Sequence, residues 1–89
     1  MMMKIDFSKS FKKSYKKLSK KDKELFSKVS LKLANDEILE PKYRDHALKG
    51  DYVGFRECHL KPDLLLIYKK QDDKLILYCL DIGSHSELF

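Results

Sequence analysis

Three histidines and one aspartate of this 89-residue sequence have side chains suited to proton transfer. An imidazole titrates near neutral pH, so a histidine can serve as a base or as an acid. Cleavage of an RNA phosphodiester needs a base that removes the 2′-hydroxyl proton and an acid that protonates the departing 5′-oxygen. A nearby carboxylate can fix the tautomer of an imidazole, and a cation can stabilise the charge on the phosphorane. The residues that fit these roles are His46, His59, Asp63 and His85.

The same residues also have simpler interpretations. Three histidines are an ordinary number for a chain of this length. Asp63 follows Pro62 and is typical of a turn, and Phe89 could be a frayed end or a plug of the core. Clusters of histidine and aspartate also bind zinc or nickel, but the sequence has no compact pair such as H-x-x-x-H on a helix. We therefore expect no metal site and no cofactor.

Length and charge restrict the kind of protein. A chain of 89 residues with 43% apolar content fits one domain, and its net charge of +5 favours an anionic partner such as nucleic acid or an acidic protein. The charge is unevenly distributed. Residues 1–34 have eleven lysines against three acidic residues, whereas residues 35–89 have eight basic residues against eleven acidic ones. The N-terminal part is therefore expected to carry the basic surface, although lysine-rich helices are most often simply solvated.

The cysteines and the apolar runs indicate a cytoplasmic protein. Cys58 and Cys79 lie inside apolar runs without the short spacing of metal ligands, so we expect reduced, buried thiols. The start of the chain, residues 1–6, has no apolar stretch of the kind found in export signals. The longest apolar run, residues 64–68, is too short to span a bilayer.

The N-terminal part predicts a short extended segment at residues 5–7 and then two helices. Apolar residues recur at helical spacing in the first helix, which we expect at residues 9–18. Ser19, with Asp22 three residues later, predicts the start of a second helix that fades near Asn35 and ends before Pro41. The residues expected on the buried faces are Phe7, Phe11, Tyr15, Leu18, Leu25, Phe26, Val29 and Leu33.

After Pro41 the pattern predicts strands at residues 52–60, 64–70 and 75–82, separated by the turn-like sequences K-P-D and Q-D-D. These strands form an antiparallel meander, and the middle one lacks alternation, as in a strand that is covered on at least one face. The expected fold is α+β, with the order β-α-α-β-β-β and two N-terminal helices packed on a small, mainly antiparallel sheet.

Assumed registers bring the candidate residues together. A first hairpin centred near Pro62 pairs Leu60 with Leu64, and a second hairpin centred between Asp72 and Asp73 pairs Leu64 with Asp81.

These registers predict that His59, Asp63 and Asp81 gather at one end of the sheet. His85 then folds back over that end, and His46 enters from the loop that precedes the strand beginning at residue 52.

Four segments carry a resemblance to a known family. They are D-H-A-L-K-G at residues 45–50, G-F-R-E-C-H at 54–59, P-D-L-L-L-I-Y at 62–68 and G-S-H-S-E-L-F at 83–89. In this order and spacing they resemble the YafQ branch of the RelE/ParE toxin superfamily, over about half of the chain. All three histidines lie inside the match.

The resemblance implies a RelE-like fold and the toxin of a type II toxin-antitoxin system. It implies a ribosome-dependent, metal-independent endoribonuclease that cleaves mRNA in the 30S A site and inhibits translation. The implied partners are a cognate antitoxin and, for the toxin-antitoxin complex, operator DNA; no membrane is implied. His46, His59, Asp63 and His85 match the catalytic positions, with His85 expected as the acid and Asp63 or His59 as the base. Phe89 matches a terminal aromatic that contacts the substrate.

Two positions depart from the family pattern. Leu64 stands where similar toxins often have an aromatic residue, and Asp81 stands where many have an arginine that holds the scissile phosphate. We therefore expect Arg56 or Lys61 to supply the missing positive charge to the substrate. Two alternatives stay open, namely a ParE-like inhibitor of a topoisomerase on the same fold and a catalytically impaired partner of an antitoxin and DNA.

Overall fold

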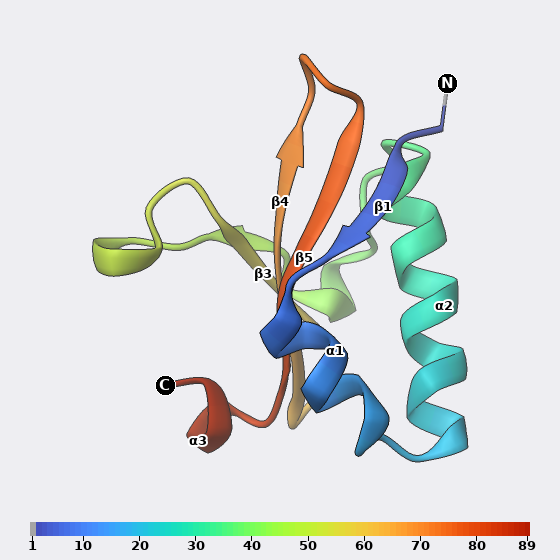
Figure 1. Ribbon diagram of the computed structural model, residues 1–89, viewed down its shortest axis with the longest axis vertical. Coiled ribbons are helices and arrows are strands. Elements are labelled where there is room, and N and C mark those ends of the chain that lie inside the picture. Colours follow the sequence, from blue (N-terminus) through green and yellow to red (C-terminus); the bar gives the residue numbers. More distant parts are fainter. Residues whose placement is uncertain (1) are drawn as a thin grey trace.

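The computed structural model describes residues 2–89 (Figure 1). Met1, which belongs to the N-terminal run considered above, lies outside the described residues. The regular elements, in chain order, are β1 (Lys4–Phe7), α1 (Lys9–Lys16), α2 (Lys20–Ala34), the 3₁₀ turn η1 (Pro41–Tyr43), β2 (His46–Ala47), the 3₁₀ turn η2 (Gly50–Tyr52), β3 (Arg56–Lys61), β4 (Leu64–Gln71), β5 (Ile76–Gly83) and α3 (His85–Leu88).

Serine caps start both N-terminal helices. The hydroxyl of Ser8 accepts a hydrogen bond from the backbone N–H of Phe11 at the start of α1, and Ser19 does the same for Asp22 at the start of α2. The second helix matches its prediction. The first ends at Lys16 rather than at residue 18, because the N–H groups of residues 17 and 18 bond to carbonyls three residues earlier and tighten the last turn.

The five strands form one mixed sheet in the order β1-β5-β4-β3-β2. The predicted antiparallel meander of β3, β4 and β5 is confirmed. Two strands extend it. β1 pairs in parallel with β5, and β2 pairs antiparallel with β3. The expected α+β fold with two helices on a small, mainly antiparallel sheet is therefore confirmed, with a larger sheet than expected.

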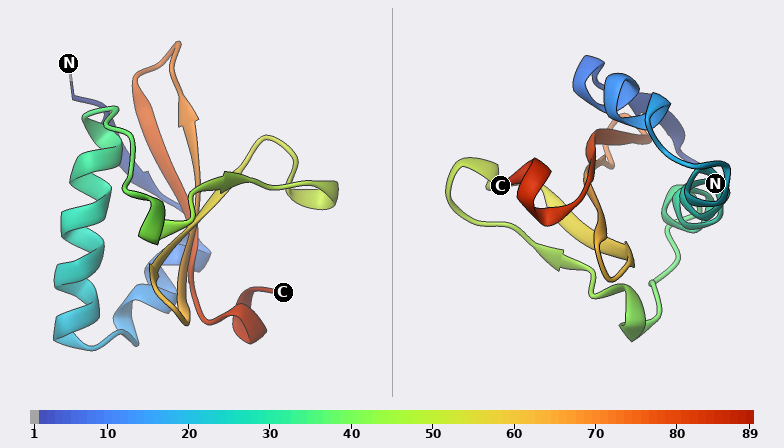
Figure 2. Two further views of the ribbon diagram at one scale, coloured as in Figure 1. Left: turned by 180° about the vertical axis from the view of Figure 1, so that it is seen from behind. Right: turned by 90° about the horizontal axis from the view of Figure 1, so that it is seen from below.

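Both long helices lie on the same side of the sheet (Figure 2). Their buried side chains pack against alternate residues of the strands and form a single core. β4 lies at the centre of the sheet, and its residues 64–68 are all buried. Leu65 and Ile67, each 1% exposed, are buried outside that core cluster, on the face of the sheet opposite α1 and α2. The principal members of the core are Phe11, Phe26, Val29, Leu33, Cys58, Leu66, Tyr68, Leu77 and Cys79.

The strand predicted at residues 52–60 corresponds to β3, and the prediction that it begins at residue 52 was wrong. Residues 50–52 form η2, and Gly54 has a φ of 94°, which interrupts an extended backbone. The strand begins at Arg56. His46 was expected in a loop, but it lies in the short edge strand β2, where it pairs with Glu57 of β3.

The register of the first hairpin is as predicted except at the turn. His59 lies opposite Leu65, but an irregularity between residues 59 and 61 pairs Lys61, rather than Leu60, with Leu64.

The register of the second hairpin was wrong. The turn occupies residues 72–75, with Leu75 in the left-handed region, and a bulge interrupts the pairing between residues 67 and 68 of β4. Asp81 therefore lies opposite Ile67, and Gly83 lies opposite Leu65. The shift places Asp81 level with Ile67 rather than with Leu64, although Asp81 and Asp63 still line one hollow, and it places Gly83, just before α3, level with His59.

Within residues 2–89, no helix is both long enough and apolar enough to cross a membrane.

Candidate active site

Two of the three histidines share one buried carboxylate. The Nε2 atom of His46 lies 3.6 Å from Oε1 of Glu57, and the Nε2 atom of His59 lies 3.4 Å from the same oxygen. The pairing of the strands explains the contact, because His46 lies opposite Glu57 and His59 follows two residues later on the same face of β3. The side chain of Glu57 is only 7% exposed, whereas that of His46 is 51% exposed. One carboxylate therefore faces both imidazole rings and can fix their positions.

A backbone contact fixes the tautomer of His46. Its Nδ1 atom lies 2.7 Å from the carbonyl oxygen of Arg44. A carbonyl only accepts hydrogen bonds, so Nδ1 carries the proton and donates it. In the neutral ring, Nε2 therefore has the free lone pair and is the atom that can accept a proton next to Glu57.

A second charged cluster supports β2 and β3 from the side of the core. The carboxylate of Asp45 accepts a hydrogen bond from Nε of Arg56 at 3.2 Å and another from the hydroxyl of Tyr68 at 2.5 Å. Burial raises the pKa of Tyr68 above its ordinary range, and the hydrogen bond to Asp45 raises it further. Burial alone would lower the pKa of Arg56, but its interactions with Asp45 and Tyr68 outweigh burial and raise it. Arg56 is thus held by an internal partner.

His85 is the first residue of α3, which lies on the side of the sheet opposite α1 and α2 (Figure 1). A capping box starts this helix: the hydroxyl of Ser84 accepts a hydrogen bond from the N–H of Glu87, and the carboxylate of Glu87 accepts one from the N–H of Ser84. The hydrogen bond from the Ser84 backbone lowers the pKa of Glu87. The ring of Phe89 lies 5.2 Å from the ring of His85 and 5.5 Å from the ring of Tyr52, which connects α3 with η2.

Asp63 and Lys61 lie at the turn between β3 and β4. Asp63 is exposed and lines a hollow next to α1 and α3, which is separate from the hollow lined by His59. The Nζ atom of Lys61 lies 2.9 Å from a carboxylate oxygen of Asp22 in α2. The structure therefore brings together His46 and His59, whereas Asp63 lies in a neighbouring hollow.

Asp81 anchors α1 to the sheet. Its carboxylate accepts hydrogen bonds from the hydroxyl of Ser10 at 2.9 Å, from the hydroxyl of Ser14 at 2.8 Å and from the backbone N–H of Ile82 at 2.8 Å. The predicted grouping of Asp81 with His59 was wrong, because the bulged register places Asp81 beside α1. Its neutral partners satisfy the carboxylate within the fold.

Two residues of this region, Glu57 and Arg44, were not predicted from the sequence. A glutamate between Arg56 and Cys58 resembles an exposed strand residue, but its spacing of two from His59 was a usable signal that both share one face. Arg44 lies two residues before His46, and its role depends on a backbone carbonyl that no side-chain pattern reveals.

Among residues 2–89, no group of three or more histidine, cysteine, aspartate or glutamate side chains is arranged to hold a metal ion.

Comparisons with known proteins agree with this architecture. The sequence profile described as "Bacterial toxin of type II toxin-antitoxin system, YafQ" matches residues 3–89. The chain is 34% identical over 88 residues to the mRNA interferase toxin YafQ of Escherichia coli K12, covering 96% of this chain and 94% of that protein.

Solved structures give the same result. A metal-bound toxin from Helicobacter pylori is 50% identical, with a TM-score of 0.91 over 99% of this chain and 100% of that one. The E. coli DinJ–YafQ toxin-antitoxin complex contains a chain that is 32% identical, with a TM-score of 0.85 over 100% of this chain and 99% of that one. The match over nearly the whole length shows that this chain belongs to the YafQ family of bacterial toxins of type II toxin-antitoxin systems.

Proposed function

We propose that this toxin is an mRNA interferase, a ribosome-dependent endoribonuclease that cleaves mRNA in the 30S A site and thereby inhibits translation. The observation that carries the proposal is the buried carboxylate of Glu57 between His46 and His59, on the side of the sheet that also holds His85. The name of the E. coli relative supports the same activity.

The proposed reaction is a transesterification that needs only proton transfer. A base removes the proton of the 2′-hydroxyl, and the 2′-oxygen attacks the adjacent phosphorus. The bond to the 5′-oxygen then breaks as an acid protonates that oxygen, which leaves a 2′,3′-cyclic phosphate and a 5′-hydroxyl. We propose that the reaction is independent of metal, so cleavage should persist with a chelator that removes transition metals but leaves Mg²⁺ for the ribosome.

The roles can be assigned from the contacts of each group. We propose His59 as the base, with His46 beside it, because Glu57 contacts both rings and stabilises the imidazolium that forms when either ring takes the proton. His85 is the proposed acid, since it is exposed at the start of α3, two residues after Gly83, which is level with His59 across the sheet. Asp63 is a further proposed catalytic group, placed in the neighbouring hollow.

Phe89 and Lys61 are proposed to contact the RNA. The ring of Phe89 is 50% exposed and can stack on a base next to His85. The side chain of Lys61 is half exposed, although it pairs with Asp22. Arg56 is proposed to support the site mainly by fixing the position of β3, because its guanidinium is already held by Asp45.

The direct test is mRNA cleavage in a reconstituted translation system. Single alanine substitutions of His46, His59 and His85 should each slow cleavage by about 10²- to 10⁴-fold, the usual contribution of a positioned acid or base. Asp63→Asn should also slow cleavage, whereas Asp72→Asn, in the turn at the other end of β4, is the matched control and should not. Circular dichroism verifies that each variant is folded.

The alternatives make different predictions in the same experiments. A topoisomerase inhibitor would arrest growth while mRNA stays intact, and it would block supercoiling by gyrase. A catalytically impaired antitoxin partner would bind DNA in the complex but would not be toxic when produced alone. Cleavage that is retained in the His59→Ala and His85→Ala variants would refute the interferase proposal.

We also propose that a cognate antitoxin covers the helical side, with operator DNA bound by the complex. A groove of about 670 Å³ between β1, α1 and α2 is lined mainly by apolar and aromatic side chains, and Lys12 and Lys16 stand at its rim. Leu31, at the same groove, is 50% exposed. An acidic amphipathic segment would match both the apolar floor and the lysines.

A further inference from the structure

A phosphodiester under nucleophilic attack gains negative charge, which a fixed cation can stabilise. Two cations near the histidines already have internal partners. The Nε atom of Arg56 lies 3.2 Å from Asp45, and the Nζ atom of Lys61 lies 2.9 Å from Asp22. Each is therefore already paired with a carboxylate of the protein.

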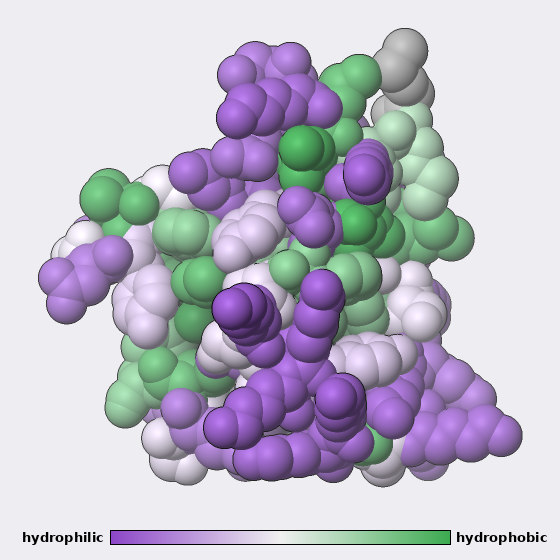
Figure 3. Space-filling model, viewed as in Figure 1, coloured by the Kyte–Doolittle hydropathy of each residue, from purple (hydrophilic) through white to green (hydrophobic). Residues whose placement is uncertain are grey.

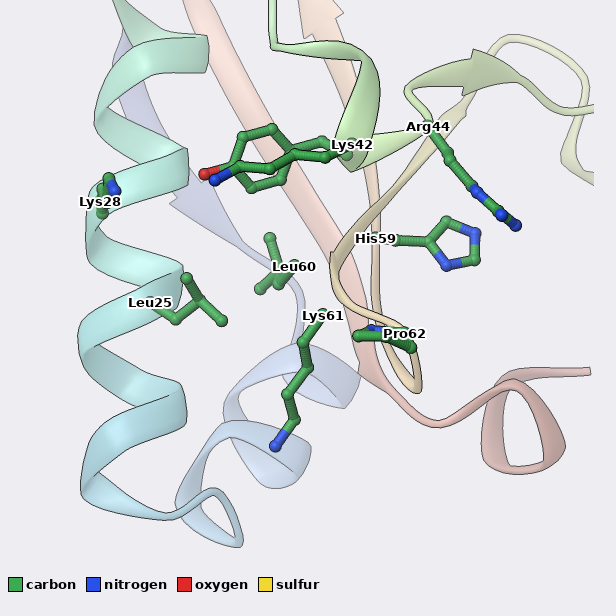
Figure 4. A pocket seen from close by; sticks show the side chains of 9 residues that line it. Leu25, Lys28, Lys42, Arg44, His59, Leu60, Lys61 and Pro62 are labelled. Atoms are coloured by element: carbon green, nitrogen blue, oxygen red, sulfur yellow. The ribbon is translucent and has the colours of Figure 1, made fainter.

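Arg44 differs from both. It is exposed, and no carboxylate within residues 2–89 lies within ion-pair distance of its guanidinium. It lines the same hollow as His59, a space of about 490 Å³ that Lys28 and Lys42 also line. In Figure 4 the guanidinium projects past the ring of His59, whereas Lys42 and Lys61 point towards the helices.

The backbone holds Arg44 in a defined place. Its φ of 48° and ψ of 42° put it in the left-handed region, which is unfavourable for a residue with a Cβ atom. The buried ring of Tyr43 anchors the preceding residue, and the contacts of Asp45 with Arg56 and Tyr68 anchor the following one. The same conformation directs the carbonyl of Arg44 to Nδ1 of His46. The position of the cation is therefore coupled to that of the imidazole.

We propose that Arg44 is a phosphate-binding residue of this site, where its guanidinium holds the non-bridging oxygens of an RNA phosphodiester beside His59. An arginine suits this role because its planar fork of N–H groups matches two phosphate oxygens at once. Lys28 and Lys42 extend the positive lining of the hollow for the adjacent backbone of the same strand. The inference rests on the proposed nuclease function, because Arg44 would bind a phosphate of the RNA that the nuclease cleaves.

The test uses the full chain and two probes. The first probe is a short RNA with a 2′-O-methyl group at each sugar, which can bind but cannot be cleaved; its affinity is measured as a function of salt concentration. The second is mRNA cleavage in the translation system. Arg44→Gln should reduce cleavage by about tenfold or more, the value of a hydrogen bond to a charged group. It should also flatten the salt dependence of binding by about 0.7 in the slope of log K against log salt.

Two variants serve as controls. Arg44→Lys keeps the charge but loses the fork, so it should keep the salt slope and recover only part of the cleavage rate. Lys74→Gln, in the turn between β4 and β5 far from the hollow, removes one charge and should match the unmodified protein.

The outcomes separate the inference from the function on which it rests. Wild-type affinity, salt slope and cleavage in Arg44→Gln, with cleavage lost in His59→Ala, would overturn the role of Arg44 and leave the nuclease intact. Slower cleavage with an unchanged salt slope would also overturn it, because Arg44 would then act only by positioning His46. If the unmodified protein cleaves no RNA, the nuclease proposal fails, and the salt slope of Arg44→Gln still decides whether Arg44 binds phosphate.

Discussion

Glu57 is a carboxylate at 7% side-chain exposure whose nearest charged groups are two imidazoles. Removing a carboxylate from water is costly unless partners compensate for the lost hydration. The contacts of Glu57 with the two rings therefore couple its burial to the positions of His46 and His59. This is the arrangement expected of a site that stabilises an imidazolium formed during the reaction.

Replacement of Glu57 by glutamine tests this coupling at nearly constant shape. We expect Glu57→Gln to slow RNA cleavage by about 10- to 100-fold, because a hydrogen bond or close contact to a charged group contributes about 1.5–3 kcal/mol. The measurement is the single-turnover rate on ribosome-bound mRNA. Glu24→Gln, which changes an exposed glutamate of α2, is the matched control. An unchanged rate in Glu57→Gln would show that the buried charge has no part in catalysis.

The cysteines behave as the sequence predicted. Both are free and buried. Burial raises the pKa of Cys79 to about 12, with a smaller contribution from nearby Asp6, and burial likewise raises the pKa of Cys58. At neutral pH neither thiol forms the reactive thiolate, so both act as core side chains.

Candidate catalytic residues could be predicted from the sequence where few residue types can perform the chemistry. The three histidines were predicted as candidate catalytic residues because few other side chains transfer protons near neutral pH, and Asp63 was predicted because it matches the family pattern; their catalytic roles stay predictions. Glu57 and Arg44 were missed because their importance depends on burial and on a left-handed backbone, which arise only when β2 and β3 pair.

At the scale of elements, the short helix α3 places His85. Its four residues are too few to form a stable helix alone, so the capping box and the contact between Phe89 and Tyr52 must hold it. The S-x-x-E signal for this box, at Ser84 and Glu87, is visible in the sequence.

Gly83 is the point where this arrangement can be tested. A Cβ atom added there would stand 3.0 Å from a carboxylate oxygen of Glu87 and 3.6 Å from a methyl carbon of Leu88. We expect Gly83→Ala to displace Glu87 from the Ser84 N–H, loosen α3 and slow cleavage, while the sheet stays folded. NMR amide exchange of residues 84–88 measures the loosening.

Acid provides a second way to loosen α3 in the unmodified protein. The pKa of Glu87 is lowered in the folded state, so its contribution to stability is present above the ordinary glutamate pKa and is lost as the pH falls through the lowered value. The protection factors of the α3 amides, which are corrected for the intrinsic pH dependence of exchange, should therefore fall on acidification, and this fall should be absent in Glu87→Gln, where the charge is already missing. Equal protection of α3 in Gly83→Ala and in the unmodified protein would contradict this account.

The elements and the antiparallel meander of β3, β4 and β5 were mostly predictable, whereas the register of the second hairpin and the pairing of β1 and β2 were not. Helical spacing located α1 and α2, Ser19 marked the start of α2, and apolar runs located β3, β4 and β5. The error in the second hairpin came from Leu75 in the left-handed region and from a bulge, two features without a reliable local signal. The parallel pairing of β1 with β5 joins residues that are distant in sequence, so no local pattern predicts it.

At the scale of the whole molecule, exposed lysines are concentrated over α1 and the start of α2. Hydrophilic side chains gather over α1 and the start of α2 in Figure 3. Six exposed lysines contribute to this region, namely Lys12, Lys13, Lys16, Lys17, Lys20 and Lys21. Only Lys12 and Lys16 among the six also line the apolar groove. The two subsets can therefore serve different partners.

Charge substitutions in the two subsets should separate these partners. Replacing Lys12 and Lys16 by glutamate should weaken binding of the antitoxin encoded beside the toxin, because an acidic segment would meet like charge at the groove. Replacing Lys13, Lys17, Lys20 and Lys21 by glutamine should weaken binding to 30S particles and flatten its salt dependence by about 0.7–0.9 for each phosphate contact that is lost. Titrations with both partners, for both variants, are the measurement. Unchanged binding of both partners would mean that the lysines are only solvated.

The chemical ends of cleaved RNA test the central claim most directly. We predict that mRNA cut by this protein in a translation system carries a 2′,3′-cyclic phosphate on the upstream fragment and a 5′-hydroxyl on the downstream fragment, as mass spectrometry can show. We predict also that the His59→Ala variant, folded as judged by circular dichroism, produces neither end. Fragments with a 5′-phosphate, or the same cyclic ends from His59→Ala, would contradict the catalysis assigned to this site.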